Sequence, residues 1–388
     1  MPMPRKDIFN SATVESMLRV PNLKWHTNPP DVIPMWIAAP DFPLAPEIKQ
    51  ALRDAVEAED IYYNTDTAAK VAMAEKISRF NKIPVTPDDV MVLQGVDPSL
   101  WLAVKHTCKP GDEVIITDPM YSPFRGSLDA AGAKPILWEL EEEDGYRFDV
   151  EKLKKLVTKK TRLIGVCNPH NPTGRAMTKE ELKGIADVAV DKKINIVSDE
   201  LWEDIVFDDR KHISMASLGP EIEALTLTSW GFSKTFGIAG LQLGYMASTN
   251  KEAMADMRKQ ATGIQRGSST LAKAIAPVML DSTLDWWRRD MMKHLTKIRN
   301  LCATRMNEMN GVTFPHLDGT YVPFPRFDLG INSKHLADRL IKDWKVGLSA
   351  GIGFGARGEG HLRMCIATSE AIMKDALDRI EAATEKLG

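Results

Sequence analysis

Between Val90 and about Ser248, short apolar runs rich in β-branched residues alternate with longer segments of helical period. Helices are expected between the runs, for example over residues 98–108 and over residues 179–192, where Thr178 and Glu181 form a capping box. Right-handed crossovers between such strands give a mostly parallel sheet. The continuous apolar character of the runs predicts that helices cover both sheet faces, so chemistry belongs at the carboxyl ends of the strands. The runs are VMVLQG, EVIIT, LIGVCNP, INIVSDE, LTLTSW and LGYMAS.

The last hundred or so residues have a different pattern and predict a second structural unit. A long helix is expected over 284–309, followed by a Pro/Gly-rich patch at 311–330 and an amphipathic helix over 369–387. The first forty-odd residues are too rich in Pro and Trp for one regular element, so we expect an arm packed on another surface, with a neighbouring subunit as one candidate. The predicted division is an arm and part of the small domain at 1–45, a large domain at 46–285 and a C-terminal small domain at 286–388.

Composition favours a globular protein that acts on small molecules. The 388 residues are 44% hydrophobic, enough for a sizeable core, and the net charge of -3 comes from interspersed acids and bases. That charge pattern argues against a nucleic-acid partner and against a polybasic membrane anchor. We see no signal peptide or membrane span, and the scattered cysteines suit neither a disulfide framework nor a structural metal site, so a cytoplasmic location is expected. These cysteines are Cys108, Cys167, Cys302 and Cys365.

Lys234 is the candidate for covalent chemistry. It lies in the stretch GFSKTFG, from Gly231 to Gly237, between two expected strands, and we expect a loop there. A lysine that forms imines needs a lowered pKa, and Phe232 and Phe236 would help to exclude water from it. A solvated loop lysine is the alternative interpretation.

Two further strand ends carry candidate ligand contacts. Asp199 ends the run INIVSD, where its carboxylate would keep a ligand ring nitrogen protonated, or would simply cap the next helix. The turn Gly95-Val96-Asp97 follows the run VMVLQ and opens a helix with Pro98 in its first turn. Backbone amides at such a helix start bind phosphate, although any strand-turn-helix has a similar pattern.

Asn171 and Arg363 complete the candidates that the residues themselves suggest. Asn171 lies in CNPHNPTGR, where two Asn-Pro pairs fix an extended loop and the side-chain amide would donate to a ligand oxygen or form a turn. His170 in the same loop is expected to be structural. Arg363, in GEGHLRMCIA, suits a bidentate grip on a substrate carboxylate or an exposed salt bridge.

Taken together, these segments resemble the fold-type I pyridoxal phosphate family, which includes the aspartate aminotransferases. The resemblance extends over nearly the whole chain and rests on NPHNPTGR, SDE, FSKTFGIAGLQLGY and GEGHLRMCIA. It implies the aspartate aminotransferase-like α/β fold, with a mostly parallel central sheet in a large domain and a smaller α+β domain. It also implies pyridoxal 5'-phosphate as the cofactor.

The resemblance assigns roles at the ring of that cofactor. Lys234 bonds the cofactor as an imine and later shuttles the α-proton, and Asp199 pairs with the pyridine nitrogen. Asn171 touches the ring hydroxyl, Tyr121 of DPMYSPF stacks on the ring, and Arg363 binds the substrate α-carboxylate. Ala38, in PMWIAAPDF, and Asn171 are the other expected substrate contacts.

At the phosphate, the chain departs from the usual aminotransferase pattern. The turn Gly95, Val96 and Asp97 is retained, but Gln242 stands where an arginine is usual and Gly231 where a serine is usual. Trp202 replaces a tyrosine that meets the ring hydroxyl, and it can donate from its indole nitrogen but cannot act as an acid or base.

The resemblance also implies a homodimer with shared active sites. Tyr63, in IYYNTDTAAK, resembles the tyrosine that reaches the cofactor phosphate of the neighbouring subunit, with adjacent Tyr62 as the other choice. Ser268 or Ser269, in QRGSST, is a further candidate contact across the interface.

The reaction is predicted to be transamination between an L-amino acid and a 2-oxo acid. The first alternative is a cystathionine β-lyase-like C–S lyase, which LKW, PMWIAAPDF, GVDP, PHNP and AGLQ also resemble. Against that alternative, Trp202 stands at its usual histidine position and APDF replaces its DMDF. The second alternative, suggested by the missing phosphate ligands, is a catalytically idle regulatory protein. Arg125 and Arg266 are the candidates for a second arginine that would mark a dicarboxylic substrate.

Overall fold

The computed structural model describes residues 5–263 and 267–388, and these form a seven-stranded central sheet of order β2-β8-β7-β6-β5-β3-β4. β8 is antiparallel to both of its neighbours, while β4, β3, β5, β6 and β7 are parallel. The predicted mostly parallel sheet is therefore confirmed. Its strands are β2 (Val90–Leu93), β3 (Glu113–Asp118), β4 (Lys134–Glu139), β5 (Thr161–Cys167), β6 (Asn195–Asp199), β7 (Thr226–Gly231) and β8 (Gly244–Ala247).

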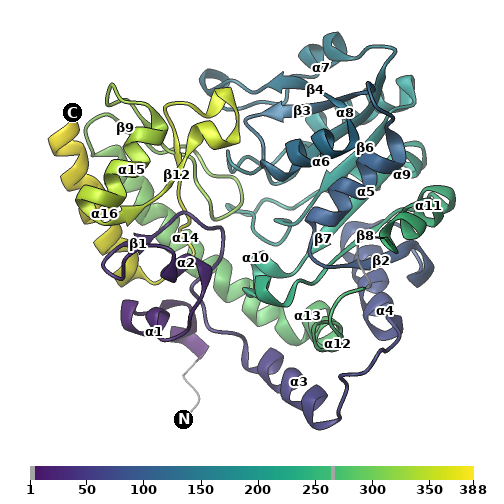
Figure 1. Cartoon of the computed structure of the whole chain (residues 1–388), viewed down its shortest axis with the longest axis horizontal. Coiled ribbons are helices and arrows are strands. Elements are labelled where there is room, and N and C mark those ends of the chain that lie inside the picture. The colour runs from purple at the N-terminus through teal and green to yellow at the C-terminus, as the bar shows by residue number, and fades with distance from the viewer. Residues whose placement is uncertain (1–4, 264–266) are drawn as a thin grey trace.

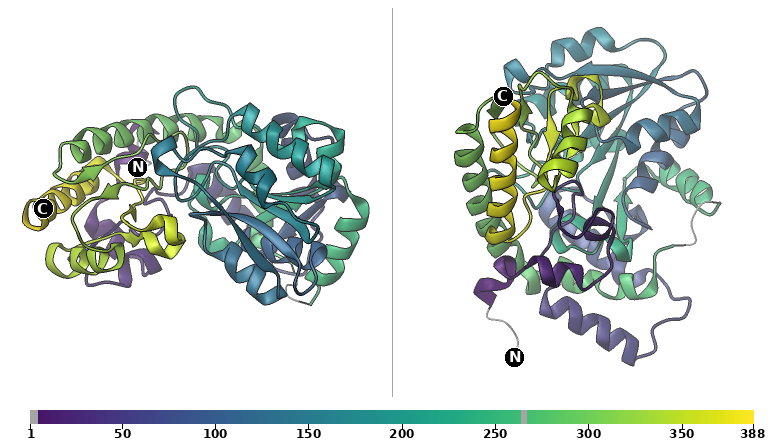
Figure 2. Two further views of the ribbon diagram at one scale, coloured as in Figure 1. Left: turned by 90° about the horizontal axis from the view of Figure 1, so that it is seen from above. Right: turned by 60° about the vertical axis from the view of Figure 1, so that its left-hand side comes forward.

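Helices cover both faces of this sheet, as the continuous apolar runs predicted. Adjacent residues of β3 show this directly, because Val114 packs in one apolar cluster with Phe124 while Ile115 packs in the opposite cluster with Ile185. Figure 2 shows the sheet between its helices in two further views. One face is covered by α5 (Asp97–Thr107), α6 (Pro123–Ala131) and α11 (Lys251–Ala261), and the other by α7 (Val150–Leu156), α8 (Lys179–Lys192) and α9 (Pro220–Leu225).

The C-terminal residues form a second group of elements beside the sheet, and the N-terminal segment lies with them (Figure 1). Ile33 of β1 pairs in parallel with Val346 of β11, which ties the N-terminal segment to this group. Because the pairing joins the two ends of the chain, it supports the division at 1–45, 46–285 and 286–388, which we retain as a proposal. The elements are β1 (Ile33–Pro34), α14 (Asp285–Asn307), β9 (Val312–Thr313), β10 (Arg326–Phe327), α15 (Ser333–Trp344), β11 (Val346–Gly347), β12 (Ser349–Ala350), β13 (Leu362–Arg363) and α16 (Glu370–Leu387).

The remaining helical elements are mostly short. Among all the described helices, none has the length and apolar character needed to span a bilayer. The remaining α-helices are α1 (Val14–Leu18), α2 (Leu23–His26), α3 (Pro46–Glu57), α4 (Thr67–Lys76), α10 (Ser233–Phe236), α12 (Thr270–Ala274) and α13 (Ala276–Leu280). The other helical turns are η1 (Arg5–Asn10), η2 (Ile77–Asn81), η3 (Pro87–Asp89), η4 (Glu142–Asp144), η5 (Met215–Leu218), η6 (Ala239–Leu241), η7 (Ser282–Leu284), η8 (Gly351–Phe354) and η9 (Ala356–Gly358).

The helix signals in the sequence are found where they were expected. α8 begins with the predicted capping box, in which the Thr178 hydroxyl accepts from the Glu181 amide and the Glu181 carboxylate accepts from the Thr178 amide. Ser369 caps α16, and the apolar stripe of that helix is buried. Strand β4 was missed. It is an edge strand that pairs with β3 alone and contains Pro135, so its apolar signal is weak.

Candidate active site

Four predicted residues meet where the carboxyl ends of the sheet strands face the C-terminal group of elements. Asp199 is the last residue of β6, Asn171 follows β5, and Lys234 follows β7. Arg363 comes from β13 on the opposite side and donates from Nη1 to Asn171 Oδ1 at 3.0 Å. We refer to Lys234, Asp199, Asn171 and Arg363 as the lysine cluster.

Lys234 lies in the one-turn helix α10, so the predicted loop is wrong in this detail. The turn is anchored by its neighbour Thr235, whose hydroxyl donates to Asp204 at 2.9 Å and whose carbonyl accepts from Trp287 Nε1 at 2.8 Å. The Lys234 ammonium donates to the Ala38 carbonyl oxygen at 2.8 Å. Burial, with a further contribution from the positive charge of Arg363, lowers the pKa of Lys234 to about 8. A much larger fraction of this amine is therefore neutral near pH 7 than for an exposed lysine.

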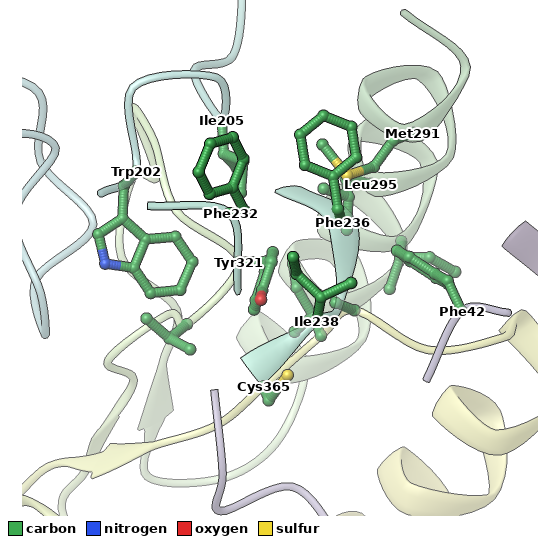
Figure 3. Close-up of a cluster of buried hydrophobic side chains, with 14 of the residues drawn as sticks. Phe42, Trp202, Ile205, Phe232, Phe236, Ile238, Met291, Leu295, Tyr321 and Cys365 are labelled. Atoms are coloured by element: carbon green, nitrogen blue, oxygen red, sulfur yellow. The ribbon is translucent and has the colours of Figure 1, made fainter. Parts of the chain in front are cut away.

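Aromatic side chains form a wall beside Lys234, and Figure 3 shows two of them, Trp202 and Tyr321. Its ammonium lies 5.3 Å from the centre of the Trp202 ring, and Trp202 contacts Tyr321 edge to face at 4.7 Å. The Tyr321 hydroxyl donates to the Lys234 carbonyl oxygen at 3.2 Å. The wall keeps water away from the lysine, which is the physical source of its lowered pKa.

Asp199 is almost fully buried, with 3% of its surface exposed. Its Oδ1 accepts from the Leu201 amide at 3.1 Å. Burial nevertheless dominates and raises the pKa of Asp199 to about 7, with the nearby Asp97 carboxylate also raising it and Lys234 opposing. The positive charge of Lys234 therefore offsets only part of the effect of burial on the pKa of Asp199.

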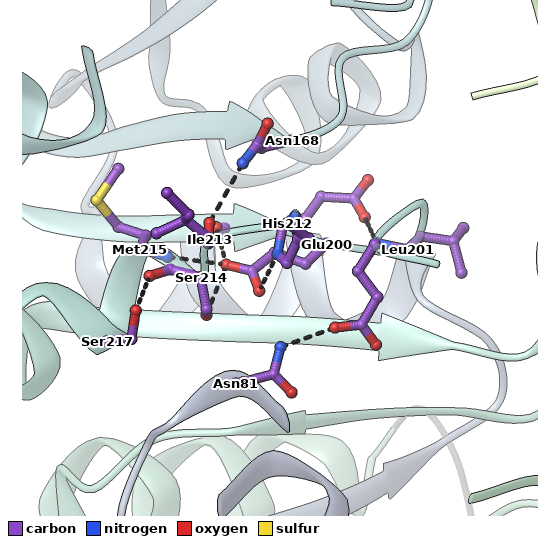
Figure 4. A network of polar contacts seen from close by, with 12 residues as sticks. Asn81, Asn168, Glu200, Leu201, His212, Ile213, Ser214, Met215 and Ser217 are labelled. Carbon is purple, nitrogen blue, oxygen red and sulfur yellow. Dashed lines mark hydrogen bonds and ion pairs between the residues drawn. The ribbon is translucent and has the colours of Figure 1, made fainter. Parts of the chain in front are cut away.

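A polar network around Glu200 fixes the backbone that follows Asp199 (Figure 4). Buried Glu200 accepts from Ser198, Ser214 and the Met215 amide through Oε1, and its Oε2 contacts His212 Nε2 at 3.0 Å. These contacts lower the pKa of Glu200 against the effect of burial. The network ties strand β6 to residues 212–215, so Asp199 is held on a rigid support.

Arg363 is held by two acceptors and one ring. Besides Asn171, its guanidinium donates from Nη2 to the Trp36 carbonyl oxygen at 3.1 Å, and it lies 4.6 Å from the centre of the Phe354 ring. The side chain is 8% exposed, and burial lowers its pKa to about 10, which still leaves it cationic at neutral pH. No carboxylate pairs with Arg363 among the described residues, so the positive charge is available to an anionic ligand.

The N-terminal segment 36–41 contacts both cations of the lysine cluster. The Trp36 carbonyl accepts from Arg363 and the Ala38 carbonyl accepts from Lys234. A buried ion pair between Lys24 and Asp41, at 2.9 Å, anchors this segment. The motifs LKW and APDF contain the pair, but a backbone carbonyl leaves no side-chain signal in a sequence, so these contacts were not predicted.

The predicted phosphate turn lies at the start of α5, beside the lysine cluster. Gly95 has a φ of +87°, a conformation that favours glycine, and a Cβ at the neighbouring Gly244 would come within 2.5 Å of the Gly95 backbone, so close approach requires glycine at 244. Val96 precedes the helix and Asp97 is its first residue. The Tyr121 hydroxyl donates to Asp97 Oδ1 at 3.4 Å, which places Tyr121 at the same edge. We call residues 95–97 the amide turn.

The two unusual residues near the amide turn have different surroundings. A Cβ at Gly231 would lie 2.7 Å from Leu201 Cδ1 and 3.0 Å from Val96 Cγ2, so apolar side chains fill the space of the missing serine side chain. Gln242 is exposed, has a φ of +50°, and its carbonyl accepts from the Ser268 hydroxyl at 3.0 Å. Ser268 thus contacts this segment from within the same chain.

Some of the other candidates are not brought into the cluster. Tyr63 is 100% exposed and Tyr62 is 70% exposed, on the connection between α3 and α4. Arg125 is exposed on α6, and Arg266 lies outside the described residues. His170 is fully buried between the Thr117 and Thr173 hydroxyls, and burial lowers its pKa to about 3, in keeping with the expected structural role.

Comparison with known proteins now identifies the family. Residues 30–380 match the aminotransferase class I and II family. The chain belongs to this aminotransferase family. The aspartate aminotransferase of Pyrococcus abyssi is 33% identical over 358 residues, covering 90% of this chain and 91% of that protein. The cystathionine beta-lyase PatB of Bacillus subtilis is 30% identical over 361 residues, covering 91% and 92% of the two chains. A PLP-bound protein of Clostridium difficile 630 has the same fold, with a TM-score of 0.91 at 28% identity and coverage of 97% and 99%.

These findings confirm the predicted family, the aspartate aminotransferase-like fold and the enzyme class. The aminotransferase uses pyridoxal 5'-phosphate. The lysine cluster fits this cofactor on physical grounds. A buried carboxylate with a pKa raised to about 7 suits a ring that brings its own positive charge, and a lysine with a pKa lowered to about 8 suits bond formation with an aldehyde.

Proposed function

We propose that the lysine cluster is the catalytic centre of this aminotransferase and that it moves an amino group between an L-amino acid and a 2-oxo acid. The observation that carries the proposal is the position of Lys234. Its amine has a pKa of about 8 and lies in one cluster with a buried carboxylate, Asp199, and a buried guanidinium, Arg363. An amine, an acid and an anion-binding group are the protein groups that the reaction needs.

The residues divide the work as follows. Arg363 binds the substrate carboxylate in bidentate fashion and orients the α-carbon towards Lys234. When bound, pyridoxal phosphate supplies an aldehyde carbon for the amino group and a ring that accepts electrons from the α-carbon. Lys234 Nζ removes the α-proton of the substrate and later returns a proton. The Asp199 carboxylate would pair with the ring nitrogen of the cofactor and keep it protonated. Asn171 Nδ2 donates to the ring hydroxyl oxygen, because its Oδ1 is already engaged by Arg363. Trp202 and Tyr321 exclude water.

The proposal includes a homodimer with shared sites. Tyr63 is fully exposed, and it lines an open hollow of 1380 Å³ together with Gln242, Ser268 and Lys273. An exposed tyrosine next to exposed Tyr62 and Ile61 is a costly apolar surface for a monomer, which supports a second copy of the chain at this surface. We also propose a cytoplasmic location, which the buried free thiols support.

Transamination and β-elimination share the removal of the α-proton, and PatB is 30% identical to this chain, so a C–S lyase activity is the second candidate. The test is to incubate the purified protein with cystathionine in one sample, and with an amino acid plus 2-oxoglutarate in another. Glutamate from the second sample without thiol from the first supports transamination. Thiol and pyruvate from the first sample, with no glutamate from the second, would overturn it.

A panel of amino acids, followed by the change in cofactor absorbance, would define the side-chain preference. Arg125 lies on the exposed surface of α6, and Arg266, the other candidate for a second arginine, lies outside the described residues. Faster changes with aspartate than with apolar or aromatic amino acids would indicate a second cationic group at the site.

A further inference from the structure

Asp97 places a negative charge at the amide turn. It is the first residue of α5, and its Oδ1 lies 3.4 Å from the Tyr121 hydroxyl. Its charge acts on both central groups of the lysine cluster, because it adds to the effect of burial in raising the pKa of Asp199 and opposes the effect of burial that lowers the pKa of Lys234. The carboxylate is exposed to solvent, and its contact with the Tyr121 hydroxyl directs it towards Tyr121 at the edge of the site.

The neighbouring residues do not neutralise this charge. No ion pair to Asp97 is formed among residues 5–263 and 267–388. Gln242 adds no charge, and the position of Gly231 is enclosed by Leu201 and Val96. Among the described residues, Lys234 is the positively charged side chain that acts on Asp97. Its ammonium already donates to the Ala38 carbonyl.

At the start of a helix, the exposed amides and the helix dipole stabilise a carboxylate in the same way as they stabilise a bound phosphate. The exposed amides and the helix dipole stabilise one negative charge there, and a second one is repelled by the first. In this chain Asp97 occupies that position before any ligand binds.

We propose that Asp97 repels the phosphate of the cofactor and thereby weakens the binding of pyridoxal 5'-phosphate relative to a chain with a neutral residue at this position. The inference rests on the proposed function, because it takes the amide turn as the phosphate subsite. It predicts selectivity as well: the penalty applies to the phosphorylated cofactor and not to unphosphorylated pyridoxal.

The test measures dissociation constants by equilibrium dialysis for the full-length protein stripped of cofactor. Asp97→Asn should bind pyridoxal 5'-phosphate about tenfold more tightly than the unmodified protein, since like-charge repulsion is removed. Its affinity for pyridoxal should change by less than about twofold, and the gain for the phosphorylated form should shrink in about 0.5 M NaCl because salt screens the repulsion. Asp129→Asn, which removes an exposed charge on α6, is the matched control and should leave both constants unchanged.

Unchanged or weaker binding of pyridoxal 5'-phosphate by Asp97→Asn would overturn the inference, and so would an equal gain for pyridoxal. Asp97→Thr serves as a second variant if the asparagine protein does not fold, and the same outcomes apply to it. Borohydride reduction of the unmodified protein distinguishes failure of this inference from failure of the proposed function. An adduct on Lys234 with no effect at Asp97 rejects this inference alone, whereas no adduct rejects the proposed function.

Discussion

The lysine cluster and the amide turn differ in how completely the chain itself holds their polar groups. In the lysine cluster, Arg363 has two acceptors, Lys234 has one carbonyl, and Asp199 stands on the Glu200 network. At the amide turn, Asp97 has a single long contact to Tyr121, and Gln242 is exposed. One end of the site is rigid and buried, and the other is open to solvent.

From this difference we infer that catalysis and cofactor affinity depend on separate parts of the chain. Chemistry at the α-carbon needs groups of perturbed pKa in fixed positions, and burial supplies both properties in the lysine cluster. Retention of the phosphate needs charge and a closed surface, and in the proposed homodimer the exposed Tyr63 of the other copy would contribute there. Changes in the lysine cluster should therefore lower turnover strongly, whereas changes at the amide turn should alter binding modestly.

The largest effect is expected for Lys234→Ala. Loss of the group that moves the α-proton should lower kcat by about 10⁴-fold, while a weaker, noncovalent cofactor complex persists. Steady-state assays give the first quantity and equilibrium dialysis the second. Lys154→Ala, at an exposed position on α7, is the control. Turnover close to that of the unmodified protein would remove Lys234 from the proposed role.

Asp199→Asn should lower kcat by about 100- to 1,000-fold, because the amide cannot balance a positive ring nitrogen. The same change should stabilise the cofactor-free protein. The folded-state pKa of Asp199 is raised from 3.8 to about 7, so the folded chain binds more protons in that window and loses stability as pH rises through it.

Above pH 7 the free energy of unfolding of cofactor-free Asp199→Asn should therefore exceed that of the unmodified protein by about 2 to 4 kcal/mol. Urea unfolding at pH 5 and pH 8 measures this. The difference between the two proteins should be larger at pH 8, and an equal difference at both values would show that Asp199 is not held in the state described above.

Arg363→Lys keeps the charge but loses the two-pronged grip. We expect a loss of about 2 to 3 kcal/mol in transition-state stabilisation, which is roughly 100-fold in kcat/KM, expressed mainly as a higher KM for the amino acid. Arg357→Lys on the exposed neighbouring turn is the control. An unchanged KM would mean that the substrate carboxylate binds elsewhere.

The smallest effect is expected at Gln242, near the amide turn. Gln242→Arg adds a positive charge at an exposed position that already tolerates a φ of +50°, so folding should be unaffected. Pyridoxal 5'-phosphate should bind about three- to tenfold more tightly with kcat within about twofold of the unmodified value. A large fall in kcat would show that the two ends of the site are not separable.

Much of the fold could be predicted because its signals are local. The capping box at Thr178 predicts the start of α8, and the apolar runs predict the central strands. β4 was missed because an edge strand that contains Pro135 lacks a continuous apolar run. In the candidate site, Lys234 and Asp199 were singled out by their positions after and at the end of expected strands, and the resemblance to the pyridoxal phosphate family assigned their roles.

The contacts that tune those side chains could not be predicted, because they come from distant segments. The Ala38 carbonyl meets Lys234 across 196 positions of sequence, and Trp36 meets Arg363 across 327. Filling of the Gly231 position by Leu201 and Val96 is likewise a property of packing. Sequence names the reactive groups, and the tertiary structure sets their pKa values.

Mass spectrometry shows whether Lys234 carries the cofactor in a covalent bond. The purified protein is incubated with pyridoxal 5'-phosphate, reduced with borohydride, digested and mapped. We predict a phosphopyridoxyl group on Lys234, in the peptide that contains GFSKTFG. An adduct on another lysine, or no adduct at all, would contradict the account.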